Sequence, residues 1–199
     1  FWGFGAGHQD GEVMLGGTFH NGTMLKDNNV YVNDWLSTDG GDNFRGFVHP
    51  ILARTTYSDF GKKVLSGNRL LPNTTTSFNH LPHASRSVGY SGNIAFHPQL
   101  YQTILSTEFT RIWRTDDNGL NWELVYDFGT GLLHSLQIAW SNPDIMYVAW
   151  QANTTSVARK IYKTTNGGQT WTEITPSSAI IPNDRQIAYD LAVSSQDPN

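Results

Sequence analysis

The sequence contains no cysteine among its 199 residues. This absence excludes disulfide bridges, thiolate metal sites and a cysteine nucleophile, and it leaves the redox compartment open. No run of 18 or more apolar residues is present, and residues 1–5 lack the charged and apolar regions of a signal peptide. We therefore expect no membrane-spanning segment and no direct membrane insertion.

Charge is also scarce, because only 15% of the residues are Asp, Glu, Lys or Arg and the net charge is -4. No cluster of Lys and Arg with interleaved aromatic residues occurs, which argues against a nucleic-acid surface. The chain instead has 38% hydrophobic residues, 19 Gly and 7 Trp. This composition favours many short strands joined by tight turns, so the sequence predicts an all-β class.

Two octets with the pattern Ser/Thr-x-Asp/Asn-x-Gly-x-x-Trp lie 49 residues apart, at 115–122 and 164–171. The Asp or Asn accepts hydrogen bonds from nearby backbone N–H groups, the Gly permits a positive φ, and the Trp packs across a hairpin. We expect each octet to build a turn. The residues that fix the pattern are Thr115, Asp117, Gly119, Trp122, Thr164, Asn166, Gly168 and Trp171.

These octets resemble the Asp-box of BNR-repeat, or sialidase-like, β-propellers. The resemblance implies that each box joins the outer two strands of a four-stranded blade. Asn166 replaces the usual Asp in the second copy, and Asn121 replaces the usual Thr in the first.

A second periodic feature is a short apolar segment that ends at a proline. The four prolines, Pro50, Pro98, Pro143 and Pro198, are 48, 45 and 55 residues apart. Proline cannot continue a central strand, and a propeller blade needs roughly 40–50 residues. The sequence thus predicts one propeller segment that is part of a larger, closed propeller. Its expected divisions are a partial blade and turn at 1–44, blades at 45–92, 93–135 and 136–188, and the first strand of another blade at 189–199.

Residues 37–44 also match the octet, with Phe44 in place of Trp. They lie only six residues before Pro50, so we interpret them as a Gly-rich turn that leads into the next inner strand. The blade at 45–92 then has no box, and residues 70–76 are expected to form an irregular loop in its outer part.

Catalysis has one candidate residue, Asp116. Sialidases need an arginine triad and a Tyr/Glu pair, and no matching motif is found. Xyloglucan-hydrolysing propellers also carry box-like repeats, and there a catalytic Asp follows Arg-Thr, as Asp116 follows Arg114-Thr115. Glycoside hydrolysis requires two carboxylates, however, and the alternative is that Asp116 is a solvent-facing box residue.

Ligand binding has four candidate residues: His20, Asn21, Trp35 and Arg45. His20 and Asn21 lie in a Gly-rich segment, 16–23, where backbone can approach a ligand, although a plain hairpin turn explains the segment as well. Trp35 lies in a polar stretch and could stack on a sugar ring. The histidines lack a defined third or fourth ligand spacing, so we expect no metal site and no cofactor.

The sequence therefore predicts a non-catalytic β-propeller module of a secreted or cell-surface protein, for adhesion, scaffolding or binding of a glycan or protein partner. Sequons at Asn21, Asn73 and Asn153 are compatible with an extracellular location. One alternative is a glycoside hydrolase, sialidase-like or xyloglucanase-like, with carboxylates partly outside this segment. Another is an assembly factor or receptor-type propeller that binds a protein.

Overall fold

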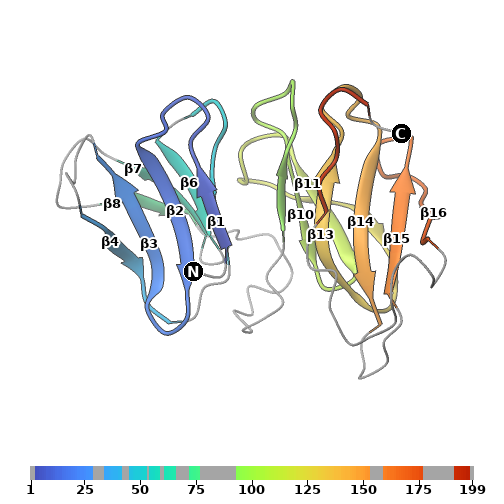
Figure 1. Cartoon of the computed structure of the whole chain (residues 1–199), viewed down its shortest axis with the longest axis horizontal. Coiled ribbons are helices and arrows are strands. Elements are labelled where there is room, and N and C mark those ends of the chain that lie inside the picture. The colour runs from blue at the N-terminus through green and yellow to red at the C-terminus, as the bar shows by residue number, and fades with distance from the viewer. Residues whose placement is uncertain are drawn as a thin grey trace. The chain divides into compact units, whose positions relative to one another are not determined.

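The computed structural model is all-β and divides into two compact units, Phe1–Ser91 and Gly92–Asn199. It describes residues 3–28, 34–41, 45–52, 54–58, 61–65, 72–76, 93–152, 159–176 and 191–197, with the backbone alone for 61–65 and 72–76. Among these residues no helix has the length and apolar character needed to cross a membrane. Each unit contains two four-stranded antiparallel sheets whose neighbouring strands are consecutive in the chain (Figure 1).

The first unit holds the sheets β1–β4 and β5–β8. The first of them consists of β1 (Gly3–Ala6), β2 (Val13–Thr18), β3 (Gly22–Asp27) and β4 (Leu36–Asp39). The other consists of β5 (Gly46–Val48), β6 (Thr55–Ser58), β7 (Gly61–Leu65) and β8 (Pro72–Thr76). Val13, Leu15 and Leu25 of one sheet form a buried cluster with Val48 of the other.

Two local expectations in this unit are wrong. Residues 72–76 form strand β8, paired with β7, where an irregular loop was expected. Ser37–Asp39 lie in strand β4 and not in a turn, because β4 pairs with β3 through Ser37 and Asp39. Residues 1–44 were expected to form a partial blade and a turn, and the described part of this range contains all four strands of the first sheet.

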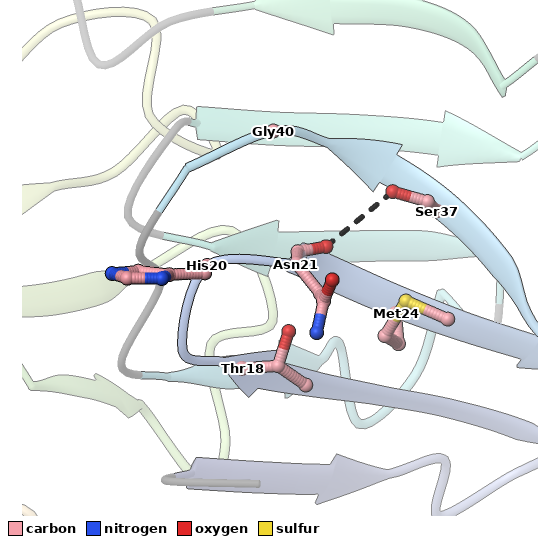
Figure 2. Close-up of a pocket in the computed structure, with 6 residues that line it drawn as sticks. All are labelled: Thr18, His20, Asn21, Met24, Ser37 and Gly40. Carbon is pink, nitrogen blue, oxygen red and sulfur yellow. Dashed lines mark hydrogen bonds between the residues drawn. The ribbon is translucent and has the colours of Figure 1, made fainter.

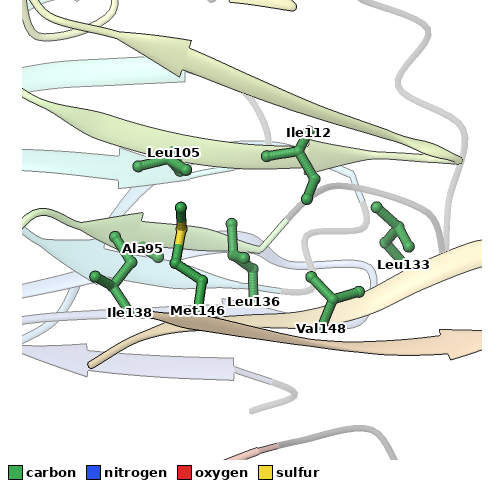
Figure 3. Packing of buried hydrophobic residues seen from close by; sticks show 8 residues of the cluster. All are labelled: Ala95, Leu105, Ile112, Leu133, Leu136, Ile138, Met146 and Val148. Atoms are coloured by element: carbon green, nitrogen blue, oxygen red, sulfur yellow. The ribbon is translucent and has the colours of Figure 1, made fainter. Parts of the chain in front are cut away.

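The second unit holds the sheets β9–β12 and β13–β16. Its strands are β9 (Ile94–Phe96), β10 (Ile104–Glu108), β11 (Arg111–Thr115), β12 (Glu123–Asp127), β13 (Leu132–Ile138), β14 (Met146–Gln151), β15 (Arg159–Thr164) and β16 (Thr172–Glu173). Figure 3 shows Leu105 and Ile112 of one sheet pointing toward Met146 and Val148 of the other. All four side chains are at least 97% buried, so this apolar contact holds the two sheets together.

Aromatic side chains extend this contact toward the outer strands. Phe128 lies between the rings of Trp171 and Tyr162, with centroid distances of 5.7 and 5.0 Å. Tyr126 contacts Phe128 edge-on at 4.9 Å, and Trp150 approaches Tyr162 at 6.4 Å. The tryptophan of the second octet therefore packs on the preceding sheet and not only on its own hairpin.

The first octet joins β11 to β12. The Thr115 hydroxyl donates to Asp117 Oδ1 at 2.7 Å and accepts the N–H of Gly119 at 2.9 Å. The Asp117 carboxylate also accepts the backbone N–H of Asn121 at 2.9 Å and its side-chain amide at 2.6 Å, while Trp122 Nε1 donates to the Gly119 carbonyl. Desolvation raises the pKa of Asp117, but these hydrogen bonds outweigh it and lower the pKa to about 2.

The second octet joins β15 to β16 with the same backbone bonds, but Asn166 Nδ2 donates to Thr170 Oγ1 at 2.9 Å, where Asp117 accepts from Asn121. The Thr164 hydroxyl donates to Asn166 Oδ1 at 2.8 Å and accepts the N–H of Gly168 at 3.1 Å. Asn166 Oδ1 accepts the N–H of Thr170 at 3.0 Å, and Trp171 Nε1 donates to the Gly168 carbonyl at 3.0 Å. The neutral amide thus reproduces the turn that the Asp117 carboxylate builds.

All four sheets share one geometry in the turn between their first and second strands. In each turn a backbone N–H donates at 2.8–3.0 Å to a carbonyl six residues later, the pairs being Gly7–Val13, His49–Thr55, His97–Thr103 and Ala139–Ile145. Each octet is tied to the turn of its own sheet by one further bond, from Asn118 N–H to the Gln102 carbonyl and from Gly167 N–H to the Asp144 carbonyl, both 3.0 Å. The octets therefore lie at the same end of the sheet as these turns.

In three segments that follow or resemble a first strand, a side chain at the start accepts hydrogen bonds from the backbone. His49 Nδ1 and His97 Nδ1 each accept the N–H groups two and three residues later, at 2.8–3.1 Å. Ser194 Oγ accepts the corresponding N–H groups at 3.2 Å, and the N–H of Leu191 donates to Ser135 Oγ on β13. Residues 191–197 thus repeat the local geometry that follows β5 and β9.

Candidate functional site

The β2–β3 hairpin has an unusual backbone at its tip. Thr18 pairs with Gly22, and between them His20 adopts a φ of 61°, which is uncommon for a residue with a side chain. The Thr18 hydroxyl donates to the Gly22 carbonyl at 2.9 Å, and the Gly22 N–H donates to the Gly41 carbonyl at 2.7 Å. The tip is therefore fixed against the segment that follows β4.

An open hollow of about 560 Å³ lies beside this tip, lined by Thr18, His20, Asn21, Met24, Ser37 and Gly40. Figure 2 shows the Asn21 amide lying between the side chains of Thr18 and Met24, with the His20 ring at the outer side. The Ser37 hydroxyl lies 3.5 Å from the Asn21 carbonyl oxygen. The hollow therefore combines hydroxyl and amide groups with one apolar side chain.

Two exposed aromatic rings stack at the hairpin tip, and one of them, His20, lines the hollow. Phe19 is 51% exposed, and its ring stacks on that of His20 with centroids 3.8 Å apart and planes inclined by 21°. Such a pair exposes part of its aromatic surface beside polar groups. Of the four predicted ligand residues, the structure brings His20 and Asn21 together at this hollow.

Trp35 occupies a different kind of position. It directly precedes β4, as Trp122 precedes β12 and Trp171 precedes β16. The residue that ends β3 is Asp27, which is buried and forms an ion pair with Arg54 at 2.7 Å. The N–H of Asn28 donates to the Glu12 carbonyl as that of Asn118 donates to Gln102, so Asp27 does not correspond to an octet threonine, and Trp35 shares with the octet tryptophans its place directly before the fourth strand.

Arg45 directly precedes the inner strand β5 and does not line the hollow. Counted from the turn histidines, its counterpart in the next sheet is Asn93. The Asn93 amide donates to the Leu136 carbonyl at 3.1 Å and thereby joins two inner strands. The equivalent position in the second unit is thus occupied by a residue with a structural contact.

Asp116 lies in the first octet turn, at the sheet end opposite to the hairpin between the second and third strands. Its carboxylate accepts the Thr103 hydroxyl at 2.6 Å and Arg114 Nε at 3.0 Å. Desolvation raises the pKa of Asp116, but the hydrogen bonds from Arg114 and Thr103 outweigh it and the pKa is lowered. Asp116 therefore carries a negative charge and holds two turns together.

His97 lies close to this ion pair. Burial and the Arg114 guanidinium lower its pKa, against the opposite effect of the Asp116 and Asp144 carboxylates. Its Nδ1 accepts two backbone N–H groups, so the proton of the neutral ring is on Nε2.

Within the described residues no group of three His, Asp or Glu side chains could hold a metal ion.

Sequence reasoning missed four residues of the hollow: Thr18, Met24, Ser37 and Gly40. Thr18 and Gly40 flank Gly-rich stretches, which is a weak local signal. Met24 and Ser37 come together through the pairing of β3 with β4, in which they are direct partners. No local motif encodes that register.

No family model matches the chain, and no curated protein matches it. Solved structures do resemble it. An ancestral GH74 enzyme has a TM-score of 0.63 at 18% identity, covering 88% of this chain and 24% of that one. The GH74 xyloglucanase from Xanthomonas campestris has a TM-score of 0.61 at 11% identity, covering 96% and 33%.

A third similar structure is the extracellular domain of a protein from B. thetaiotaomicron described as a one component system, with a TM-score of 0.65 at 11% identity. It covers 96% of this chain and 25% of that one, so the chain spans about a quarter to a third of the length of these proteins. Identities this low show the fold alone. The chain therefore has a β-propeller fold built of four-stranded antiparallel blades.

Proposed function

We propose that this chain belongs to a non-catalytic β-propeller module of a secreted or cell-surface protein, and that the module binds glycans. The observation that carries the proposal is the hollow at the β2–β3 hairpin, where hydroxyl and amide groups adjoin an exposed aromatic pair. Sugars present hydroxyl groups at their edges and apolar C–H faces, which match these two kinds of surface. A similar extracellular domain, that of the B. thetaiotaomicron protein, is consistent with the proposed location.

The state of Asp116 argues against a role as a general acid. A general acid of a glycosidase needs a raised pKa, whereas the pKa of Asp116 is lowered. Its carboxylate is also engaged by Arg114 and Thr103. The second octet has Thr165 at this position, so the turn itself does not require an acid there.

A glycan array that presents the chain with neutral and anionic oligosaccharides tests the proposal. We expect binding, and we expect no new reducing ends when the bound glycan is incubated with the protein. Asn21→Ala removes an amide of the hollow. Gln102→Ala removes an exposed amide from the turn between β9 and β10 of the second unit and is the matched control. Loss of binding in both variants alike, or in neither, would argue against the hollow as the site.

A second candidate function is glycoside hydrolysis, since two of the similar structures are GH74 enzymes. In that case the missing carboxylates belong to blades outside this segment. Release of products by a longer protein that contains this chain would favour the hydrolase.

A third candidate is a protein partner. Leu100, Tyr101 and Trp140 are 47–52% exposed, and they lie on the turns between first and second strands of the second unit. Absence of glycan binding together with capture of a protein through these side chains would favour an assembly or receptor role.

A further inference from the structure

We infer that the hollow at the β2–β3 hairpin takes a neutral sugar unit and discriminates against anionic sugars such as sialic acid or uronic acids. This inference rests on the proposed glycan-binding function and adds the class of sugar to it. It follows from the charge, the free hydrogen-bonding groups and the rigidity of the hollow.

The charge of the lining is the first argument. None of the described residues that line the hollow is a Lys, Arg, Asp or Glu. Lys26 is on the same face of β3 as Met24, two residues away, but its ammonium group lies 5.8 Å from the centroid of the Trp35 ring. A sugar carboxylate in the hollow would therefore lose hydration without gaining a guanidinium or ammonium partner from the lining.

The available hydrogen-bonding groups are the second argument. The Asn21 side-chain amide makes no hydrogen bond to the described residues, so it can offer two donors and one acceptor to a ligand. The Thr18 hydroxyl uses its proton on the Gly22 carbonyl, which leaves its oxygen as an acceptor. This mixture of donors and acceptors suits hydroxyl groups, because each hydroxyl can both donate and accept.

The aromatic rim and the fixed backbone are the third argument. Phe19 and His20 offer a stacked, solvent-exposed pair beside the hollow. The bond from Gly22 N–H to the Gly41 carbonyl and the parallel bridge between Asn21 and Gly41 hold the tip in place. A preorganised site loses less conformational entropy on binding, which matters for a weak ligand. The volume of about 560 Å³ lies within the roughly 300–1,000 Å³ typical of small-molecule sites.

The test is a titration of the chain with neutral oligosaccharides (cello-, xylo- and manno-oligosaccharides) and with anionic ones (sialyllactose and oligogalacturonate), followed by heteronuclear NMR. We expect the neutral series to bind and the anionic series to bind at least tenfold more weakly. Asn21→Ala should weaken neutral binding about fivefold, as expected for the loss of one or two hydrogen bonds, and Phe19→Ala should weaken it by a similar factor. Tyr101→Ala, which removes an equally exposed ring from the second unit, is the matched control and should leave binding unchanged.

The outcomes separate this inference from the proposed function. Anionic sugars that bind as tightly as neutral ones, with the same loss in Asn21→Ala, would overturn the neutral preference and leave the glycan-binding module intact. If Tyr101→Ala weakens neutral binding and neither hairpin variant does, the hollow is not the binding site. The proposal of a glycan-binding module would still stand. No binding of any glycan by a folded chain would overturn both.

Discussion

The exchange of Asp117 for asparagine tests how the octet turn is stabilised. The chain contains its own reference for this change, because Asn166 makes the equivalent bonds in the second octet. Asp117→Asn should therefore keep the backbone turn, while it removes the negative charge and the bond that Asp117 Oδ2 accepts from the Asn121 amide. The difference between the two proteins then measures what the charge and this bond contribute together.

The expected magnitude follows from the pKa of Asp117, which falls from 3.8 to about 2 on folding. At about 1.36 kcal/mol per pKa unit this corresponds to at most about 2.4 kcal/mol, and solvent screening of the half-buried carboxylate reduces the expectation to about 1–1.5 kcal/mol. Because the folded pKa lies below the unfolded one, this stabilisation is present above pH 3.8 and is lost as the pH falls toward 2.

Urea denaturation of both proteins between pH 7 and pH 2, followed by tryptophan fluorescence, measures the effect. We expect Asp117→Asn to be less stable by about 1–1.5 kcal/mol at pH 7 and the two stabilities to converge near pH 2. The reciprocal change, Asn166→Asp, should add a similar loss of stability in acid. Parallel pH profiles for wild type and Asp117→Asn would refute the reasoning.

Three further changes test the packing and the turns. Gly131→Ala should destabilise the second unit by about 3 kcal/mol or more, because the added Cβ would lie 2.2 Å from the Trp150 indole. Gly129→Ala has a similar positive φ but no atom within 4 Å of the added Cβ, so it should cost only about 1 kcal/mol. Calorimetry distinguishes the two variants. Replacing either octet tryptophan by alanine should cost about 3–5 kcal/mol in urea denaturation, and losses below about 1 kcal/mol at both sites would contradict the packed turn. The lowered pKa of His97 makes the folded state lose stability as the pH falls below 6.5, so His97→Ser should flatten the pH dependence of stability there. An unchanged profile would show that the ring is not an essential acceptor.

The sequence predicted the all-β class and the four-stranded organisation because its two octets have fixed internal hydrogen bonds. A threonine, an Asp or Asn, a glycine and a tryptophan at set spacing determine the turn locally, without help from distant residues. The recurring segments that end at proline likewise mark turns that close on themselves through a single backbone bond. Features of this kind are readable from a short stretch of chain.

The first sheet was harder to predict because its third and fourth strands are joined by a divergent segment. The bond from Asn28 N–H to the Glu12 carbonyl matches that of Asn118, but Trp35 follows Asn28 after seven residues where four separate Asn118 from Trp122. The regular pattern is therefore absent, and Trp35 was interpreted as a ligand platform. Its place directly before β4 depends on the pairing of β3 with β4, which contacts between strands determine.

The hollow could be predicted only in part, for the same reason. His20 and Asn21 stand out because they lie in a Gly-rich hairpin tip. Met24 and Ser37 reach the hollow through the β3–β4 pairing, which no short motif specifies.

The most direct test of the proposed function is a map of backbone amide shifts in the chain as it is titrated with the glycan that binds best on the array. The account predicts that the largest shifts occur at residues 18–24 and 37–41, with no cleavage of the glycan during the titration. Shifts concentrated at residues 97–103 and 115–122, or appearance of cleaved product, would contradict it.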